Sequence, residues 1–252
     1  MIRATLIAAV LATAPLADTA HADPVDFSFE GPFGRYDPAQ LRRGLQVYSE
    51  VCAACHGLQY VPIRTLSDPG GPGLTADQLR ALTDLLDPVV LPDGTERPRR
   101  ATDAFPTRNG LGMGPDLSLM AKARTGFDGP YGTGLNQLIH GQGGPEYIDA
   151  FLTHFTDDTQ DQADTAYYGN TVFPGGWTAM PPPLFDDMII YEDGTPASVQ
   201  QMSRDVAAFL MWTAEPRLEA RKRTGIVAVG LLTVLSALLF ALHRRLWAPL
   251  GR

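Results

Sequence analysis

The chain has two cysteines, Cys52 and Cys55, and His56 follows the second one directly. The pattern Cys-x-x-Cys-His is the sequence that covalent attachment of c-type haem requires. Two thiols at this spacing can form thioether bonds to the two vinyl groups of one haem, and the adjacent histidine can bind the iron as its proximal ligand. These five residues therefore predict one covalently bound haem c.

Two other kinds of site use a cysteine pair at this spacing. A thioredoxin-like dithiol would need a surrounding βαβ pattern, which the flanking sequence does not show. A zinc ribbon would need a second cysteine pair, and the chain has no further cysteine. Haem attachment is therefore the interpretation that fits the whole cysteine inventory.

An iron that carries electrons without binding small molecules needs a second axial ligand. Met180 is the best candidate, because three prolines follow it and fix an extended backbone that can hold a thioether sulfur against the iron. Met202 and Met211 fall instead on a strongly periodic helix pattern, where core packing explains them. The remaining candidates by residue type are His140, His154, Met113, Met120 and Met188.

The haem motif is expected at the end of an amphipathic helix, with Asp37 as its N-cap and Pro38 at its first position. A final helix is expected over residues 195–212, capped by Thr195. Other helical stretches are expected over 75–86, 118–124, 136–140 and 145–152, and an exposed acidic loop over 157–164. This pattern predicts a mainly α fold, a c-type cytochrome haem domain of about 190 residues with loop insertions.

Both ends of the chain carry membrane signals. Residues 1–22 read as a signal peptide, with a basic start, a short apolar stretch and a small-x-small cleavage site ending at Ala22. Gly225 to Leu242 gives eighteen uncharged residues, about 27 Å of helix at 1.5 Å per residue, which is close to the thickness of the hydrocarbon core. We therefore expect a periplasmic haem domain over residues 23–220, a transmembrane anchor over 221–245 and a cytoplasmic stub over 246–252, in the bacterial inner membrane.

Charge is distributed unevenly along the chain, whose formal net charge is −8. Residues 217–252 hold seven Lys/Arg and one acid, and the signal segment holds one of each, so residues 23–216 are left with −14. Such a field repels nucleic acid and attracts cationic proteins. An acidic surface that only keeps the head soluble is the ordinary alternative.

Several further motifs give the chain a family resemblance. They are Gly57-Leu-Gln-Tyr-Val-Pro-Ile-Arg64 after the haem motif, Gly114-Pro-Asp-Leu-Ser118, Ala121-Lys-Ala-Arg124, Ala179-Met-Pro-Pro-Pro-Leu184, Asp193-Gly-Thr-Pro-Ala197 and Ala207-Ala-Phe-Leu-Met-Trp-Thr-Ala-Glu-Pro216. With the C-terminal anchor they resemble the cytochrome c1 family, the haem subunits of quinol:cytochrome c oxidoreductase (bc1) complexes. The resemblance runs from about residue 25 to the end. The chain departs from the family in a short stretch over residues 70–105 and in Leu119, where an aromatic residue is more usual.

The resemblance implies roles for single residues. Cys52 and Cys55 would hold the haem, with His56 as proximal and Met180 as distal ligand. Arg124 would contact a haem propionate, Tyr131 would be the aromatic residue near it, and Pro115 would line the haem pocket. Without the resemblance, Arg124 would read as an ordinary surface arginine.

The resemblance also implies partners. Quinol would be oxidised on a cytochrome b subunit, a Rieske iron–sulfur protein would deliver one electron to this haem, and a soluble or membrane-tethered cytochrome c would remove it, in a dimeric complex. The chain would be an enzyme subunit with no catalytic site of its own. Two alternatives are a stand-alone membrane-anchored electron carrier and a haem peroxidase. A peroxidase would need a distal acid–base pair and usually a second haem motif, and the sequence has one such motif.

Overall fold

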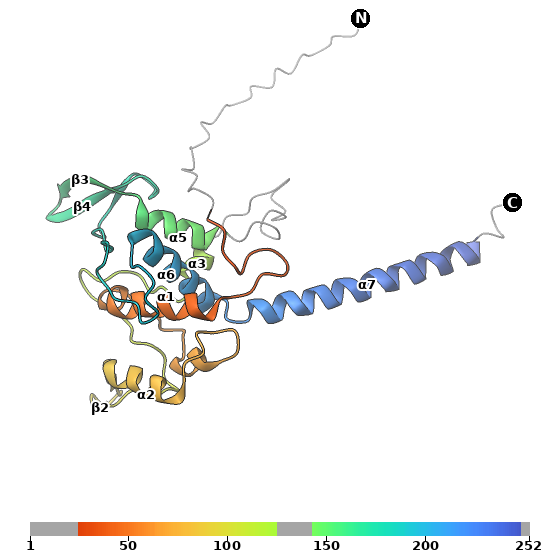
Figure 1. Cartoon of the computed structure of the whole chain (residues 1–252), viewed down its shortest axis with the longest axis horizontal. Helices are drawn as coiled ribbons and strands as arrows, with labels where there is room; N and C mark the ends of the chain where they lie inside the picture. Colours follow the sequence, from red (N-terminus) through yellow and green to blue (C-terminus); the bar gives the residue numbers. More distant parts are fainter. Residues whose placement is uncertain (1–24, 125–142, 248–252) are drawn as a thin grey trace, which may run out of the picture.

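Helices α1 (Pro38–Glu50) and α6 (Val199–Ala214) pack across each other at the centre of the head in this computed structural model, which describes residues 25–124 and 143–247 (Figure 1). Helices α3 (Met120–Ala123) and α5 (Gly144–Thr153) pack on α6 beside them. The helices meet closely at Gly44, where an added Cβ would lie 2.0 Å from the carbonyl oxygen of Asp205. The mainly α fold is therefore confirmed.

The α1–α6 crossing also contains a buried ion pair. The Asp205 carboxylate is fully buried and accepts hydrogen bonds from Arg43 Nε at 2.9 Å and from Gln201 Nε2 at 3.0 Å. Arg43 reaches a second carboxylate, Asp193, also at 2.9 Å. A buried carboxylate is tolerated only when it is paired and hydrogen-bonded, so these contacts fix the orientation of the two helices.

Helix α1 begins as the sequence predicts, because the Asp37 carboxylate accepts a hydrogen bond from the Ala39 amide at 2.9 Å. A 3₁₀ turn, η1 (Cys52–Ala54), continues it into the cysteine motif. Helix α2 (Ala76–Leu85) also matches, with Thr75 and Gln78 forming a capping box. A second 3₁₀ turn, η2 (Ile63–Ser67), and a small antiparallel hairpin, β1 (Val89–Val90) and β2 (Glu96–Arg97), lie on either side of α2 in the chain.

Residues 157–164 are exposed, as expected, but they do not form a loop. The segment belongs to an antiparallel hairpin of β3 (Phe155–Gln162) and β4 (Thr165–Asn170), to which β5 (Trp177–Thr178) adds a third strand. The two-residue turn places Ala163 and Asp164 at φ 50° and 61°, the geometry of a type I′ turn. That turn usually carries Asn-Gly or Asp-Gly, so the sequence lacks its ordinary hairpin signal.

Helix α6 contains the predicted apolar stripe, but Thr195 is not its cap. The Ser198 side chain caps it by accepting from the Gln201 amide at 3.2 Å, while the Thr195 amide donates to Asp193 in a preceding turn. Helix α7 (Leu218–Trp247) then leaves the head as a single long rod (Figure 1). Within the described ranges it is the one helix long and apolar enough to cross a membrane, and its apolar span is not covered by the head.

The start of α7 is tied to the head. Leu218 is buried, Glu219 accepts a hydrogen bond from the Tyr36 amide at 3.1 Å, and Arg221 pairs with the buried carboxylate of Glu215. Lys122 of the α3 helix reaches the same carboxylate at 3.2 Å. The first turn of α7 therefore belongs structurally to the head, and the exposed apolar surface begins near Ile226.

Candidate cofactor site

The two cysteines lie where the α1–η1 helical column ends. The amides of Cys55 and His56 both donate to the Cys52 carbonyl, at 3.1 and 2.9 Å, which wraps the motif into one tight turn. Cys52 is half-buried, Cys55 is exposed, and both are free thiols. The turn presents the Cys55 thiol at the surface and the Cys52 thiol beneath it.

The thiol chemistry argues against a redox dithiol. Burial, together with the nearby Cys55, raises the pKa of the Cys52 thiol to about 12. A thioredoxin-like nucleophile needs the opposite shift, because the thiolate is the reactive form. The described residues 25–124 and 143–247 contain no group of three or more His, Cys, Asp or Glu side chains that could hold a bare metal ion such as zinc.

The imidazole of His56 is largely buried and held by one hydrogen bond, between Nδ1 and the carbonyl oxygen of Pro115 at 2.7 Å. A carbonyl can only accept, so Nδ1 must carry the proton. This tautomer leaves the Nε2 lone pair free for a metal, as a metal-binding histidine requires. The Tyr48 hydroxyl donates to the His56 carbonyl at 3.0 Å, so the backbone of the residue is fixed as well.

Residues 114–118 bind the motif loop along its length. The Gly114 amide donates to the Cys55 carbonyl at 3.0 Å, and the Leu117 amide donates to the Gly57 carbonyl at 2.9 Å. Asp116 accepts from the Gln59 amide at 2.8 Å and from the Ser118 amide at 3.0 Å. The two quoted motifs, remote in sequence, therefore form one unit around the histidine.

Gly114 lies against the imidazole itself. A Cβ built on it would lie 2.0 Å from Cε1 of His56, so the backbone here touches the face of the ring. Pro115 contacts His56 through its carbonyl, while the residue is exposed at the surface, and its role in lining a haem pocket stays a prediction.

Met180 is half-buried and directly follows the sheet. Its amide donates to the Thr178 hydroxyl at 3.2 Å, and Thr178 pairs with Tyr168 of β4 in the strand ladder. The prolines then lead to the buried Leu184. The sheet and the core thus hold both ends of the Met180 segment. No hydrogen bond or ring contact of the described residues joins Met180 to His56, and their pairing across an iron stays a prediction.

The competing ligand candidates have other environments. Met202 and Met211 are buried inside α6, as core packing predicts. Nδ1 of His154 lies 2.9 Å from the Ala150 carbonyl at the end of α5. Met113 and Met188 are 40% and 41% exposed. His140 lies outside the described residues.

Arg124 ends α3 at the surface, and its guanidinium lies 5.4 Å from the centre of the Tyr147 ring on α5. This cation–π geometry is a local contact that the sequence did not predict. The propionate contact of Arg124 stays a prediction, and Tyr131 falls outside the described residues.

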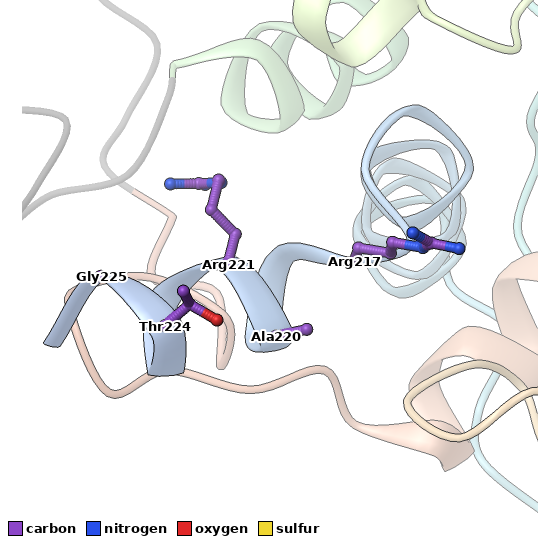
Figure 2. Close-up of a pocket in the computed structure, with 5 residues that line it drawn as sticks. All are labelled: Arg217, Ala220, Arg221, Thr224 and Gly225. Carbon is purple, nitrogen blue, oxygen red and sulfur yellow. The ribbon is translucent and has the colours of Figure 1, made fainter. Parts of the chain in front are cut away.

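An open hollow at the start of α7 is lined by Arg217, Ala220, Arg221, Thr224 and Gly225 (Figure 2). The two arginine side chains point in different directions from the helix, and no thiol, imidazole or thioether lines the hollow. The site of the predicted chemistry is therefore the motif loop and not this hollow.

Three residues of the site were not given a role by the sequence. Tyr48 is a buried residue of α1, and the role of its hydroxyl is visible only in the fold. Asp116 sits in a Pro-Asp turn, a signal that could have suggested side-chain hydrogen bonds to nearby amides. Arg108, whose Nε donates to the Ala53 carbonyl at 2.8 Å, lies in a loop without any local signal.

The chain is similar to known proteins over most of its length. The sequence matches the profile of the Cytochrome C1 family over residues 27–250. Cytochrome c1 of Rhodobacter capsulatus is 54% identical over 248 residues, which cover 90% of this chain and 89% of that protein. Cytochrome c1 of Cereibacter sphaeroides is 49% identical over 267 residues, 97% and 93% of the two chains. A Bradyrhizobium diazoefficiens protein named cytochrome b/c1 is 40% identical over 245 residues, 88% of this chain and 35% of that protein.

Proposed function

Because the chain belongs to the cytochrome c1 family, the haem-carrying electron-transfer subunits of bc1 complexes, we propose that it takes one electron from a Rieske iron–sulfur protein and passes it to a cytochrome c. The observation that carries this proposal is the hydrogen bond from His56 Nδ1 to the Pro115 carbonyl at 2.7 Å. It fixes the imidazole in the tautomer that an axial ligand needs.

The donor set fits one haem c. Cys52 and Cys55 would hold it covalently, His56 would bind through Nε2, and the thioether of Met180 would complete the ligation, with Arg124, Tyr131 and Pro115 around it. Bound haem supplies a one-electron change at iron, with His/Met ligation favouring a relatively high potential. The task of the protein is then to hold the ligands still. The tied motif loop and the pinned Met180 segment do this.

The chain would act as part of an oxidoreductase without performing acid–base or nucleophilic steps itself. Quinol oxidation would take place on a cytochrome b subunit. One relative carries both names in a single protein, cytochrome b/c1, which supports a close association of the two subunits. We propose a dimeric complex of cytochrome b, the Rieske protein and this chain.

The proposed orientation follows from the two ends of the chain. Residues 1–22 would be removed as a signal peptide, residues 23–220 would fold in the periplasm, and α7 would anchor the head in the bacterial inner membrane, with residues 246–252 on the cytoplasmic side. The exposed apolar surface of α7 supports the anchor. Its span is flanked by Arg221–Arg223 and by Arg244 and Arg245, typical of membrane interfaces.

The test is co-purification. A C-terminally tagged chain should be isolated from detergent-solubilised membranes together with a haem b subunit and an iron–sulfur protein, and haem should stay on the tagged polypeptide after denaturing electrophoresis. Isolation with covalent haem but without haem b would favour a stand-alone electron carrier. Loss of haem on acid-acetone extraction would refute the haem c site itself.

The acceptor is proposed to be a basic cytochrome c. The acidic side chains of the β3–β4 hairpin are exposed, and the exported head carries −14 by composition. Exposed charges are screened beyond about 8 Å at physiological ionic strength, so the attraction should act on the association rate. Electron transfer to a basic cytochrome c should therefore slow steeply with added salt. A rate that is flat with salt would favour docking through apolar contacts or a membrane-tethered acceptor.

A further inference from the structure

The α1–η1 helical column ends in the cysteine motif without a basic residue of its own. The last turns of α1 (Pro38–Glu50) and η1 (Cys52–Ala54) contain no Lys, Arg or His. Carbonyls at a helix end lack partners within the helix and favour a nearby cation. A donor from elsewhere in the chain is therefore expected at this point.

Arg108 supplies that donor from more than fifty residues away. Its Nε donates to the Ala53 carbonyl, between the two cysteines, at 2.8 Å. Its Nη1 forms an ion pair with Asp87, the residue that follows the α2 turn. The Arg108 side chain is 29% exposed and that of Asp87 57%, so the guanidinium lies against the motif while the carboxylate faces solvent.

The segment that carries Arg108 also meets the other end of the motif. A Cβ built on Gly57 would lie 2.7 Å from the Pro106 carbonyl oxygen and 3.1 Å from the Arg108 amide nitrogen. The backbone of residues 106–108 thus touches the loop after His56, while the Arg108 side chain holds the turn before it. Residues 106–108 therefore contact the motif loop both before and after His56.

We propose that Arg108 is a positioning residue for haem attachment and that its guanidinium, moderated by Asp87, sets part of the reduction potential. This inference rests on the proposed haem c function. The hydrogen bond to Ala53 holds the turn that carries both thiols. The fixed positive charge beside the motif favours the reduced state, which carries one negative charge more than the oxidised state. Removing Arg108 should lower the potential, and neutralising Asp87 should raise it.

The experiment uses the intact membrane complex with Arg108→Gln, Arg108→Lys and Asp87→Asn. Arg97→Gln is the matched control, because the Arg97 side chain is 28% exposed, close to that of Arg108, and forms an ion pair with Asp103 at 2.7 Å. The side-chain hydrogen bonds of Arg97 and Asp103 lie within residues 97–103, away from the cysteine motif. The readouts are the midpoint potential from redox titration and the ratio of covalent haem to polypeptide. Neither readout depends on turnover.

We expect Arg108→Gln to reduce haem loading and to shift the reduced-to-oxidised ratio at fixed ambient potential roughly three- to tenfold toward oxidised, about 28 to 59 mV at 59 mV per tenfold. Arg108→Lys should restore the potential better than the loading, because it keeps the charge but not the planar fork. Asp87→Asn should shift the ratio the opposite way with normal loading. Arg97→Gln should change neither.

The proposal is overturned if Arg108→Gln keeps both potential and loading, if Arg97→Gln reproduces its effects, or if Arg108→Gln and Asp87→Asn shift the potential in the same direction. If Arg108→Gln does not accumulate, Asp87→Asn still decides the electrostatic part, since it leaves the hydrogen bond to Ala53 intact, and Arg108→Lys decides the loading part. If the chain without substitutions lacks covalent haem, or does not co-purify with cytochrome b, the proposed function is refuted, whatever the variants do.

Discussion

Tyr48→Phe is the most informative single change that the site offers. The Tyr48 side chain is 1% exposed, and its hydroxyl donates to the carbonyl of His56 at 3.0 Å. Burial raises the pKa of Tyr48, and the nearby Cys52 and Asp116 raise it further, so the hydroxyl stays protonated and keeps donating. Phenylalanine keeps the ring and its contacts with Phe105 and Phe209, at 5.8 and 5.9 Å between centroids. The change therefore removes one hydrogen bond.

The cost can be estimated from the buried carbonyl. A hydrogen bond contributes a net ~0.5–1.5 kcal/mol, and a buried acceptor left without its partner costs ~1–3 kcal/mol. We expect a loss of about 2 kcal/mol in the free energy of unfolding. At about 2–4 °C per kcal/mol for a domain of this size, the melting temperature should fall by about 4–8 °C. The freed carbonyl should also let His56, the proposed axial ligand, shift, which would change the haem spectrum and the potential.

Tyr36→Phe is the matched control. The Tyr36 hydroxyl is buried and shares its proton between the carbonyls of Met211 and Glu215, at 3.3 and 3.1 Å, at the C-terminal end of α6. Both variants of the full-length chain in detergent should lose similar stability in denaturant titrations followed by Soret absorption. Only Tyr48→Phe should alter the Soret circular dichroism and midpoint potential. Equal spectral changes in both, or a Tyr48→Phe protein within 0.5 kcal/mol (roughly the size of a neutral surface change) of the parent, would refute the reasoning.

Met180→Leu should lower the midpoint potential and stop reduction by the Rieske protein while the complex stays assembled, whereas Met188→Leu should do neither; the reverse result in redox titrations would reject Met180 as ligand. Burial, together with the nearby Glu30, raises the pKa of Glu146 to about 7, so the folded state holds this proton more tightly than the unfolded state. Stability present below pH 4.5, the unperturbed pKa, should be lost as the pH rises through about 7. Glu146→Gln should remove that loss in denaturant titrations at pH 5.5 and 8, and an unchanged pH dependence would contradict the shift. Truncation after Gly225 should release a soluble haem head, while truncation after Arg217 should release a less stable one, because it deletes the buried Leu218 and the Glu219 contact with Tyr36; a head that stays in salt-washed membranes after either cut would show a second membrane contact.

The parts of the fold that the sequence predicted are those whose signal is local. Thr75 and Gln78 form a capping box within four residues, and the pair Asp37-Pro38 marks the start of a helix. The Cys-x-x-Cys-His motif is equally local, because attachment chemistry needs all its groups within one turn. A helix boundary is harder to predict when two nearby polar residues could each cap the helix. Thr195 was expected as the cap of α6, but Asp193 engages its amide and Ser198 caps the helix instead.

The β3–β4 hairpin could not be predicted for a physical reason. Its first strand is polar on both faces, so it shows no alternation of apolar and polar residues. Its turn contains Ala163-Asp164, which is not a usual hairpin turn sequence. The strand order is fixed by pairing with Trp177 and Thr178, which are contacts across the sheet. The same holds for Tyr48, whose hydroxyl meets its acceptor only after α1 has turned into the motif, and for Arg108, which reaches Ala53 through the folding of a loop.

The reactive groups of the site and the contacts that orient them are encoded differently in the sequence. One pentapeptide supplies the thiols and the imidazole, but the tautomer of that imidazole depends on the Pro115 carbonyl, fifty-nine residues further along the chain. The strand pairing of Thr178 with Tyr168 holds the segment before Met180, and Arg108 holds the turn between the cysteines. Neither of these two contacts has a strong local sequence pattern. A ligand set tied by several weak, separate bonds loses its geometry by degrees when one bond is removed. Potential and haem loading should consequently respond in graded steps to substitutions at Tyr48, Arg108 and Thr178, whereas loss of His56 would remove the proposed proximal ligand altogether.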